Sequence, residues 1–173
     1  NAWLTDGKTI LGGIWGAYLS VEITKWWNGI SIRTGDTFAL PAAVGILVGR
    51  WGCYIGGCCY GLPTTSGLGW RLGVPGDAPE VLRFPTQIYE MGFHAAAILW
   101  LVVADRFDWL TSQRLNLYLA AYCIYRFASE WLRPEPVIAW GLTAYQWCSL
   151  LLLLFLCWQM FRHRDEPIVR RSI

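Results

Sequence analysis

The segment from Gly49 to Gly61 reads Gly-Arg-Trp-Gly-Cys-Tyr-Ile-Gly-Gly-Cys-Cys-Tyr-Gly and directly follows the apolar run Phe38 to Val48. This order predicts that Arg50 and three cysteines lie at or near the end of a membrane-spanning helix. A charge at that depth costs on the order of a few kcal/mol unless a partner or a water-filled cavity meets it. The glycines are typical of a backbone that bends and lets another segment or a ligand approach closely. We therefore expect a binding site around Arg50.

The composition of the 173-residue chain differs from that of an ordinary soluble domain, because 55% of its residues are hydrophobic and only 15% are charged. Together with a mean hydropathy of +0.35, these values predict one integral membrane domain over residues 1–173. The net charge of +2 is too small and too scattered to indicate nucleic-acid binding. No initiating methionine and no signal-peptide pattern is found at Asn1, so we expect the chain to start inside a longer product or after processing.

Five largely apolar segments predict an all-α polytopic membrane protein with about five transmembrane helices. The expected spans are residues 10–27, 37–55, 87–104, 114–133 and 138–161. The last span contains the run Leu150 to Leu156 and is long enough to cross a bilayer. Residues 56–85 are rich in glycine and proline and lack a helical period, which predicts a long, packed, outward-facing loop. Thr86 is expected to cap the helix that follows.

The distribution of basic residues predicts the orientation of the chain in the membrane. Four arginines follow the last apolar run, namely Arg162, Arg164, Arg170 and Arg171. They indicate a cytoplasmic C-terminus. Alternation of the spans then puts the cysteine stretch and the long loop on the periplasmic side of a bacterial inner (cytoplasmic) membrane, where disulfides are permitted.

Ionisable residues within the predicted spans are the first candidates for a site. Tyr122, Arg126 and Glu130 recur at intervals of four and therefore share one helix face. Two arginines on different helices, Arg50 and Arg126, with one carboxylate between them favour an electropositive cavity for a lipid phosphate, whose oxygens match the guanidinium fork. In the simpler alternative, Arg126 and Glu130 neutralise each other while Arg50 snorkels to the surface.

The beginning of the third predicted span carries further polar residues. Gln87 and Glu90 are three residues apart and either line the same cavity or cap the helix, where a carboxylate suits the dipole. His94 lies one turn further in, among apolar residues. We expect it to be a buried, hydrogen-bonded side chain rather than a base or a haem ligand.

The six cysteines form two sets, of which Cys53, Cys58 and Cys59 lie in the glycine-rich stretch. The dispersed set, Cys123, Cys148 and Cys157, is expected to pack as small hydrophobic residues. No Cys-x-x-Cys pair or His/Cys spacing indicates zinc, so no metal or cofactor is expected. A disulfide from Cys53 to either neighbour requires a sharp turn of the backbone. As an alternative function, a low-pKa thiolate beside Arg50 would make the stretch an outward-facing thiol site for redox exchange or for accepting an acyl or metal group.

Four ordered pieces of the chain resemble the prolipoprotein diacylglyceryl transferases of bacteria. The pieces are Gly12-Gly13, Gly49-Arg50-x-Gly52 through Gly61, Pro85-Thr86-Gln87-Ile88-Tyr89-Glu90, and Tyr122-x-x-x-Arg126-x-x-x-Glu130-x-x-Arg133. The segment Gly141-Leu142-Thr143-x-x-Gln146 matches a stretch after the fourth piece. Each piece alone is weak, but together they cover nearly the whole chain in family order.

The resemblance implies a membrane enzyme that moves the diacylglyceryl group of phosphatidylglycerol to the thiol of a lipobox cysteine and releases glycerol phosphate. By position, Arg50 and Arg126 would hold the phospholipid head group and Glu130 would orient Arg126. Gly61 would shape the cavity, and Tyr122 would stand at the family's conserved tyrosine. The matched pieces also make Gln87, Tyr89, Glu90 and Arg133 candidates for substrate binding. Cys53 and Cys58, which stand within the glycine-rich piece, are further candidates for catalysis.

Four positions depart from the family's pattern. Cys53 replaces an asparagine, Cys58 replaces a glutamate, and Leu11 and Phe84 replace histidines. These changes remove the usual means of activating a substrate thiol. We therefore expect a divergent Gly-Cys-Cys-Tyr-Gly branch that lacks the family's first span. The remaining alternative is a non-catalytic subunit, on the same scaffold, of a complex with other membrane proteins.

Overall fold

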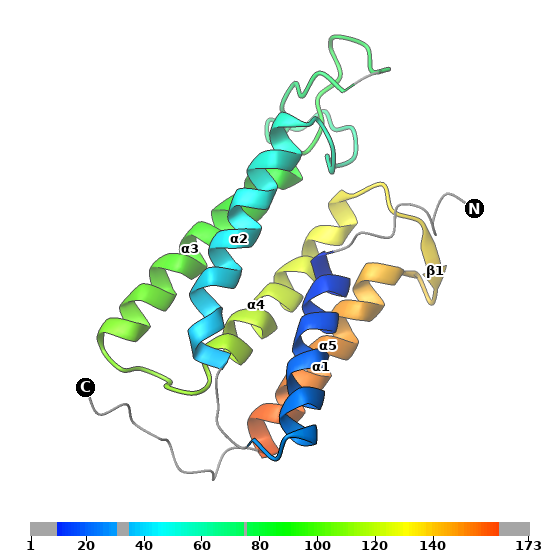
Figure 1. Ribbon diagram of the computed structural model, residues 1–173. Helices are drawn as coiled ribbons and strands as arrows, with labels where there is room; N and C mark the ends of the chain where they lie inside the picture. Colours follow the sequence, from blue (N-terminus) through cyan, green and yellow to red (C-terminus); the bar gives the residue numbers. More distant parts are fainter. Residues whose placement is uncertain (1–9, 31–34, 75, 163–173) are drawn as a thin grey trace.

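The computed structural model describes residues 10–30, 35–74 and 76–162. Within these residues the chain forms five α-helices: α1 (Ile10–Trp27), α2 (Gly35–Ile55), α3 (Thr86–Arg106), α4 (Arg114–Ser129) and α5 (Ala144–Arg162) (Figure 1). Helix α2 packs along α3, α5 packs along α4, α4 also contacts α2, and α1 lies beside α5. The structure thus confirms the prediction of an all-α protein. Arg164, Arg170 and Arg171, on which the predicted orientation partly depends, lie outside the described residues.

The helices carry large apolar side chains outward and bury polar ones, which is the arrangement that a lipid solvent favours. Val48 on α2 is 62% exposed and Leu154 on α5 is 66% exposed. By contrast, Glu90 and Gln146 are almost completely buried. By length and hydropathy, α2, α3 and α5 are able to cross a membrane. A membrane protein of helical bundle type accounts for both observations.

The fifth helix begins at Ala144 rather than at residue 138, so this predicted boundary is wrong. Residues 137–143 instead form a hairpin of two short strands, β1 (Val137–Ala139) and β2 (Leu142–Thr143). The turn between them has positive φ angles of 53° at Trp140 and 75° at Gly141. Such a two-residue turn suits the twist of an antiparallel pair. A 3-10 turn, η2 (Glu130–Leu132), connects α4 to the segment before this hairpin.

The loop of residues 56–85 between α2 and α3 is held by hydrogen bonds to itself and to η2. Leu62 donates its backbone N–H to Leu132 at 2.8 Å, and Trp70 and Arg83 exchange backbone bonds at 2.9 and 3.0 Å. The prediction that Thr86 caps α3 is wrong, because Pro85 occupies the cap position and the Thr86 hydroxyl donates to the Cys59 carbonyl at 2.7 Å.

The dispersed cysteines do not share one environment. Cys123 is buried between helices, as predicted, but Cys148 is exposed on the outer face of α5 and Cys157 is only half-buried. A small apolar thiol is tolerated on a face that meets lipid, since no polar group is desolvated there. The expectation of a core position is therefore wrong for Cys148.

Candidate functional site

The buried carboxylate of Glu90, on α3, is the centre of the polar network. Its Oε2 lies 2.9 Å from Arg50 Nη2 on α2 and 3.0 Å from Arg133 Nη2, just after η2. Tyr122, on α4, donates its hydroxyl to Glu90 Oε1 at 2.7 Å. One carboxylate therefore serves two guanidinium groups and ties α3 to three other segments of the chain. The alternative in which Arg50 snorkels to the surface is wrong, because its side chain is paired inside the protein.

Arg126 and Glu130 form a second buried ion pair, as their spacing predicts. Arg126 Nη1 lies 2.5 Å from Glu130 Oε2, although the contact lacks the angles of a hydrogen bond. The Thr143 hydroxyl donates to Glu130 Oε1 at 3.1 Å, and the Arg126 guanidinium lies 5.1 Å from the centre of the Tyr145 ring. Among the ion pairs of the described residues, Glu130 contacts Arg126 only. The carboxylate between two arginines is thus Glu90, not Glu130.

All three arginines, Arg50, Arg126 and Arg133, line one cavity of about 460 Å³. Their three positive charges face two buried carboxylates, so one charge is not offset within the buried set. Glu135 also lines the cavity, but it is half-exposed and forms no ion pair with a described residue. Arg50 Nε and Arg133 Nε are buried donors without a hydrogen-bond partner among the described residues. A buried donor left unpaired costs about 1–3 kcal/mol, so the hydrogen bonding of this arginine network is incomplete among the described residues.

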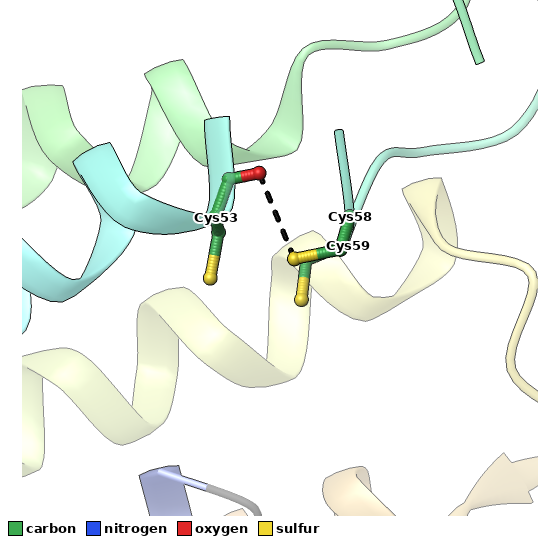
Figure 2. A group of neighbouring side chains, drawn as sticks. All are labelled: Cys53, Cys58 and Cys59. Carbon is green, nitrogen blue, oxygen red and sulfur yellow. Dashed lines mark hydrogen bonds between the residues drawn. The ribbon is translucent and has the colours of Figure 1, made fainter. Parts of the chain in front are cut away.

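Three thiols gather near the end of α2 (Figure 2), and all three cysteines line the same cavity. The Sγ atoms of Cys53, Cys58 and Cys59 all lie within 4.8 Å of one another, and the structure contains them as free thiols. The sharp turn that this requires has positive φ angles at Gly57 and Cys59. Burial, with smaller effects of the other two thiols, raises the pKa of the Cys58 thiol to about 11. A low-pKa thiolate in this stretch stays a prediction.

Several residues predicted to bind substrate lie beside this cavity rather than in its wall. Gln87 donates its side-chain amide to the Cys58 carbonyl at 2.6 Å, and the Tyr89 hydroxyl donates to the Leu68 carbonyl at 2.8 Å. Gly61 lies where the start of the loop approaches Phe84, near the end of the loop, and the backbone of η2. In the structure these residues position the loop, and their contact with substrate stays a prediction.

Tyr118 and His94 extend the network, and of these two residues Tyr118 is the one that was not predicted from the sequence. Tyr118 hydrogen-bonds His94 Nδ1 at 3.0 Å, and His94 Nε2 lies 4.0 Å from Glu90 Oε1. His94 is thus a buried, hydrogen-bonded side chain, as predicted. Tyr118 precedes Tyr122 by four residues, so the same helical spacing could have identified it.

Arg83 holds the long loop against the cysteine stretch. Its Nε and Nη2 lie 2.5 and 2.8 Å from the two carboxylate oxygens of Asp77, and its Nη1 donates to the Gly61 carbonyl at 3.2 Å. The guanidinium also lies 4.9 Å from the centre of the Tyr60 ring. These contacts link both ends of the loop.

Asp77→Asn is expected to loosen this link, with amide hydrogen exchange at Trp70 and Arg83 rising roughly two- to five-fold at neutral pH. The hydrogen bond from Arg83 lowers the pKa of Asp77 below its ordinary value. The ion pair therefore contributes fully above that ordinary value, and its contribution is lost as the pH falls through the lowered pKa. Glu80→Gln, at an exposed position in the same loop, is the control and should exchange like the unchanged protein. Equal exchange in both variants would show that the pair does not hold the loop.

Comparison with known proteins gives one consistent result. A family model described as prolipoprotein diacylglyceryl transferase matches residues 2–162. Phosphatidylglycerol–prolipoprotein diacylglyceryl transferase 2 of Clostridium perfringens is 32% identical over 154 residues, covering 86% of this chain and 59% of that protein. The protein of that name from Streptomyces coelicolor is 33% identical over 173 residues, covering 90% of this chain and 53% of its own length. The phosphatidylglycerol–prolipoprotein diacylglyceryl transferase of Zymomonas mobilis is 27% identical over 173 residues, covering 94% of this chain and 59% of that protein.

The chain therefore spans somewhat more than half the length of these curated relatives. No solved structure matches the chain significantly.

Proposed function

Because the chain belongs to the prolipoprotein diacylglyceryl transferase family, we propose that it transfers a diacylglyceryl group from phosphatidylglycerol to the thiol of a lipobox cysteine. The observation that carries the proposal is the convergence of Arg50, Arg126 and Arg133 on one cavity of about 460 Å³. A phosphodiester carries one negative charge, which matches the one guanidinium charge that the buried carboxylates do not offset. Cavities of this size commonly bind small molecules or head groups.

The chemistry proposed for this cavity is a displacement at carbon. The acceptor thiol loses its proton to solvent, and its sulfur attacks the glyceryl carbon that bears the phosphate ester. A C–S bond forms, the C–O bond breaks, and the electron pair leaves on the oxygen of glycerol phosphate. Arg50 and Arg126 would stabilise the charge that develops on this leaving group, which is where fixed donors accelerate a reaction most.

The carboxylates would act as positioning residues in this reaction. Glu130 holds Arg126, and Glu90 holds Arg50 and Arg133, so the guanidinium groups are oriented before a lipid arrives. Tyr122 fixes Glu90 in turn. Ordering of this kind lowers the cost of binding, because less side-chain freedom is lost when the head group enters.

We further propose that all five helices cross a bacterial inner membrane as one domain, with the cavity at the outer end and the C-terminus in the cytoplasm. Figure 1 supports this orientation, since the cysteine end of α2, the long loop and the β1–β2 hairpin lie at the same end of the bundle. Helix α5 ends in the basic residue Arg162. This end of α5 lies at the opposite end of the bundle, which suits the positive-inside rule.

The test is a transfer assay with the purified full-length protein, phosphatidylglycerol vesicles and a lipobox peptide. Arg126→Ala is expected to reduce the transfer rate by about 100-fold or more, the usual effect of removing one charge-stabilising donor. Arg126→Lys keeps the charge but not the planar fork and should recover only part of the rate. Arg162→Ala, at an exposed arginine, is the matched control.

Normal turnover in both Arg50→Ala and Arg126→Ala would overturn the proposal. A protein that lacks transfer activity and co-purifies with other membrane proteins at fixed stoichiometry would instead be the non-catalytic subunit.

A further inference from the structure

The three clustered thiols have the donor chemistry of a site for a soft metal ion. Thiolates select thiophilic d10 cations such as Zn²⁺ over hard cations. Zinc–sulfur bonds of about 2.3 Å in tetrahedral geometry put the sulfur atoms about 3.8 Å apart. The Sγ atoms of Cys53, Cys58 and Cys59 lie within 4.8 Å of one another, so a shift of about 1 Å or less by the side chains would close the set around one ion.

The backbone that carries these thiols is held in place from α3. Thr86 donates to the Cys59 carbonyl at 2.7 Å and Gln87 donates to the Cys58 carbonyl at 2.6 Å. Both donors are buried, and they maintain Cys59 at a φ of 61°, where residues other than glycine are uncommon. Metal sites use such outer contacts to orient their ligands. The turn is therefore built to hold its two cysteines toward Cys53.

The charges around the cluster suit a bound ion. Three thiolates and one divalent cation carry one net negative charge, and Arg50, one of the three arginines of the cavity, lies beside this group. Arg50 Nη1 contacts Cys53 Sγ at 3.9 Å, so it is already directed toward a ligand sulfur. The two sites lie in the wall of one cavity.

We propose that Cys53, Cys58 and Cys59 bind one Zn²⁺ ion, whose fourth coordination position faces the arginine cavity and takes the acceptor thiol. Three protein ligands with one open position are the arrangement of catalytic rather than structural zinc. The part of the proposal that concerns the acceptor rests on the transferase function. The bound ion would activate the acceptor thiol, which Cys53 and Cys58 do not do on their own.

The proposed role in the reaction leaves atoms and charges balanced. The three protein thiols release three protons to solvent when the ion binds. The acceptor thiol releases one more proton on ligation, because a coordinated thiol is deprotonated. Its sulfur then forms the C–S bond as the C–O bond breaks, and the neutral thioether, a weak ligand, leaves. The ion keeps its oxidation state throughout.

Metal binding is tested first, without reference to transfer. The full-length protein in detergent is treated with reductant and chelator, the chelator is removed, and Zn²⁺ is titrated against a chromophoric competitor. We expect one tightly bound ion per chain, and Co²⁺ in its place should give a thiolate charge-transfer absorption. Cys53→Ser, Cys58→Ser and Cys59→Ser should each weaken binding by about 100-fold or more. Cys148→Ser, an exposed cysteine on α5, should bind like the unchanged protein.

Two results would overturn the metal site: Zn²⁺ binding that survives all three serine variants, or a disulfide among the three cysteines in protein isolated from cells.

The fourth coordination position is tested by adding a short cysteine peptide to the Co²⁺ protein. This peptide should shift the absorption, whereas the same peptide with serine in place of cysteine should not. An absent shift would overturn the acceptor role alone. If the unchanged protein binds Zn²⁺ but transfers no diacylglyceryl group, the proposed function is wrong. If the metal-free protein transfers the group, the proposed role of the ion is wrong.

Discussion

Glu90→Ala is expected to lower the free energy of unfolding by about 3–5 kcal/mol, because it leaves two buried guanidinium groups without their shared carboxylate. Arg50 and Arg133 both rely on Glu90 Oε2, at 2.9 and 3.0 Å. The Tyr122 hydroxyl would lose its acceptor as well. The same change should abolish transfer, since neither arginine would keep its position in the cavity.

The measurement is thermal unfolding of the purified protein in detergent, with Glu135→Ala as the matched control. Glu135 lines the same cavity but is half-exposed and unpaired among the described residues, so its removal should change stability little. Glu90→Gln keeps the shape and one acceptor oxygen and should fall between the two. If Glu90→Ala does not fold, the coupling of Glu90→Gln with Arg133→Gln in a double-mutant cycle gives the same information. Equal stability of the Glu90 and Glu135 variants would show that the network is not centred on Glu90.

The parts of this network that depend on local spacing were predictable from the sequence. Tyr122, Arg126 and Glu130 follow the period of one helix, so their common face and the Arg126–Glu130 pair need no knowledge of tertiary structure. The partner of Arg50 was not predictable in this way. Glu90 is on another helix, and only the packing of α2 against α3 brings the two charges together.

The cysteine cluster shows a second limit of the sequence. The spacing of Cys53, Cys58 and Cys59 matches no common zinc pattern, and the distance between the thiols depends on a left-handed backbone at Cys59. That conformation is maintained by bonds from Thr86 and Gln87, which are far away in the chain. Likewise, the late start of α5 depends on a turn at Trp140 and Gly141, whereas the apolar residues around them continue the pattern of a span.

Gly61→Ala is expected to reduce transfer by about 100-fold and to destabilise the protein by about 1–3 kcal/mol, as overpacking in a close contact does. A Cβ at this position would lie 2.6 Å from the Leu132 carbonyl oxygen, 2.8 Å from the Phe84 carbonyl oxygen and 2.8 Å from Phe84 Cβ. These atoms belong to the backbone or lie next to it, so no side-chain rotation relieves the contact. Leu132 directly precedes Arg133, and a backbone shift there would move a guanidinium group out of the cavity.

The control for this change is Gly45→Ala, because no atom lies within 4 Å of a Cβ built at Gly45 on α2. Alanine favours a helix over glycine by about 1 kcal/mol, so this variant should be as stable as the unchanged protein or more stable, with normal transfer. Unfolding curves and transfer rates of the two variants distinguish the local contact from a general effect of replacing glycine. If Gly61→Ala behaved like Gly45→Ala, the loop would not need its close approach to η2, and Arg133 would be positioned by Glu90 alone.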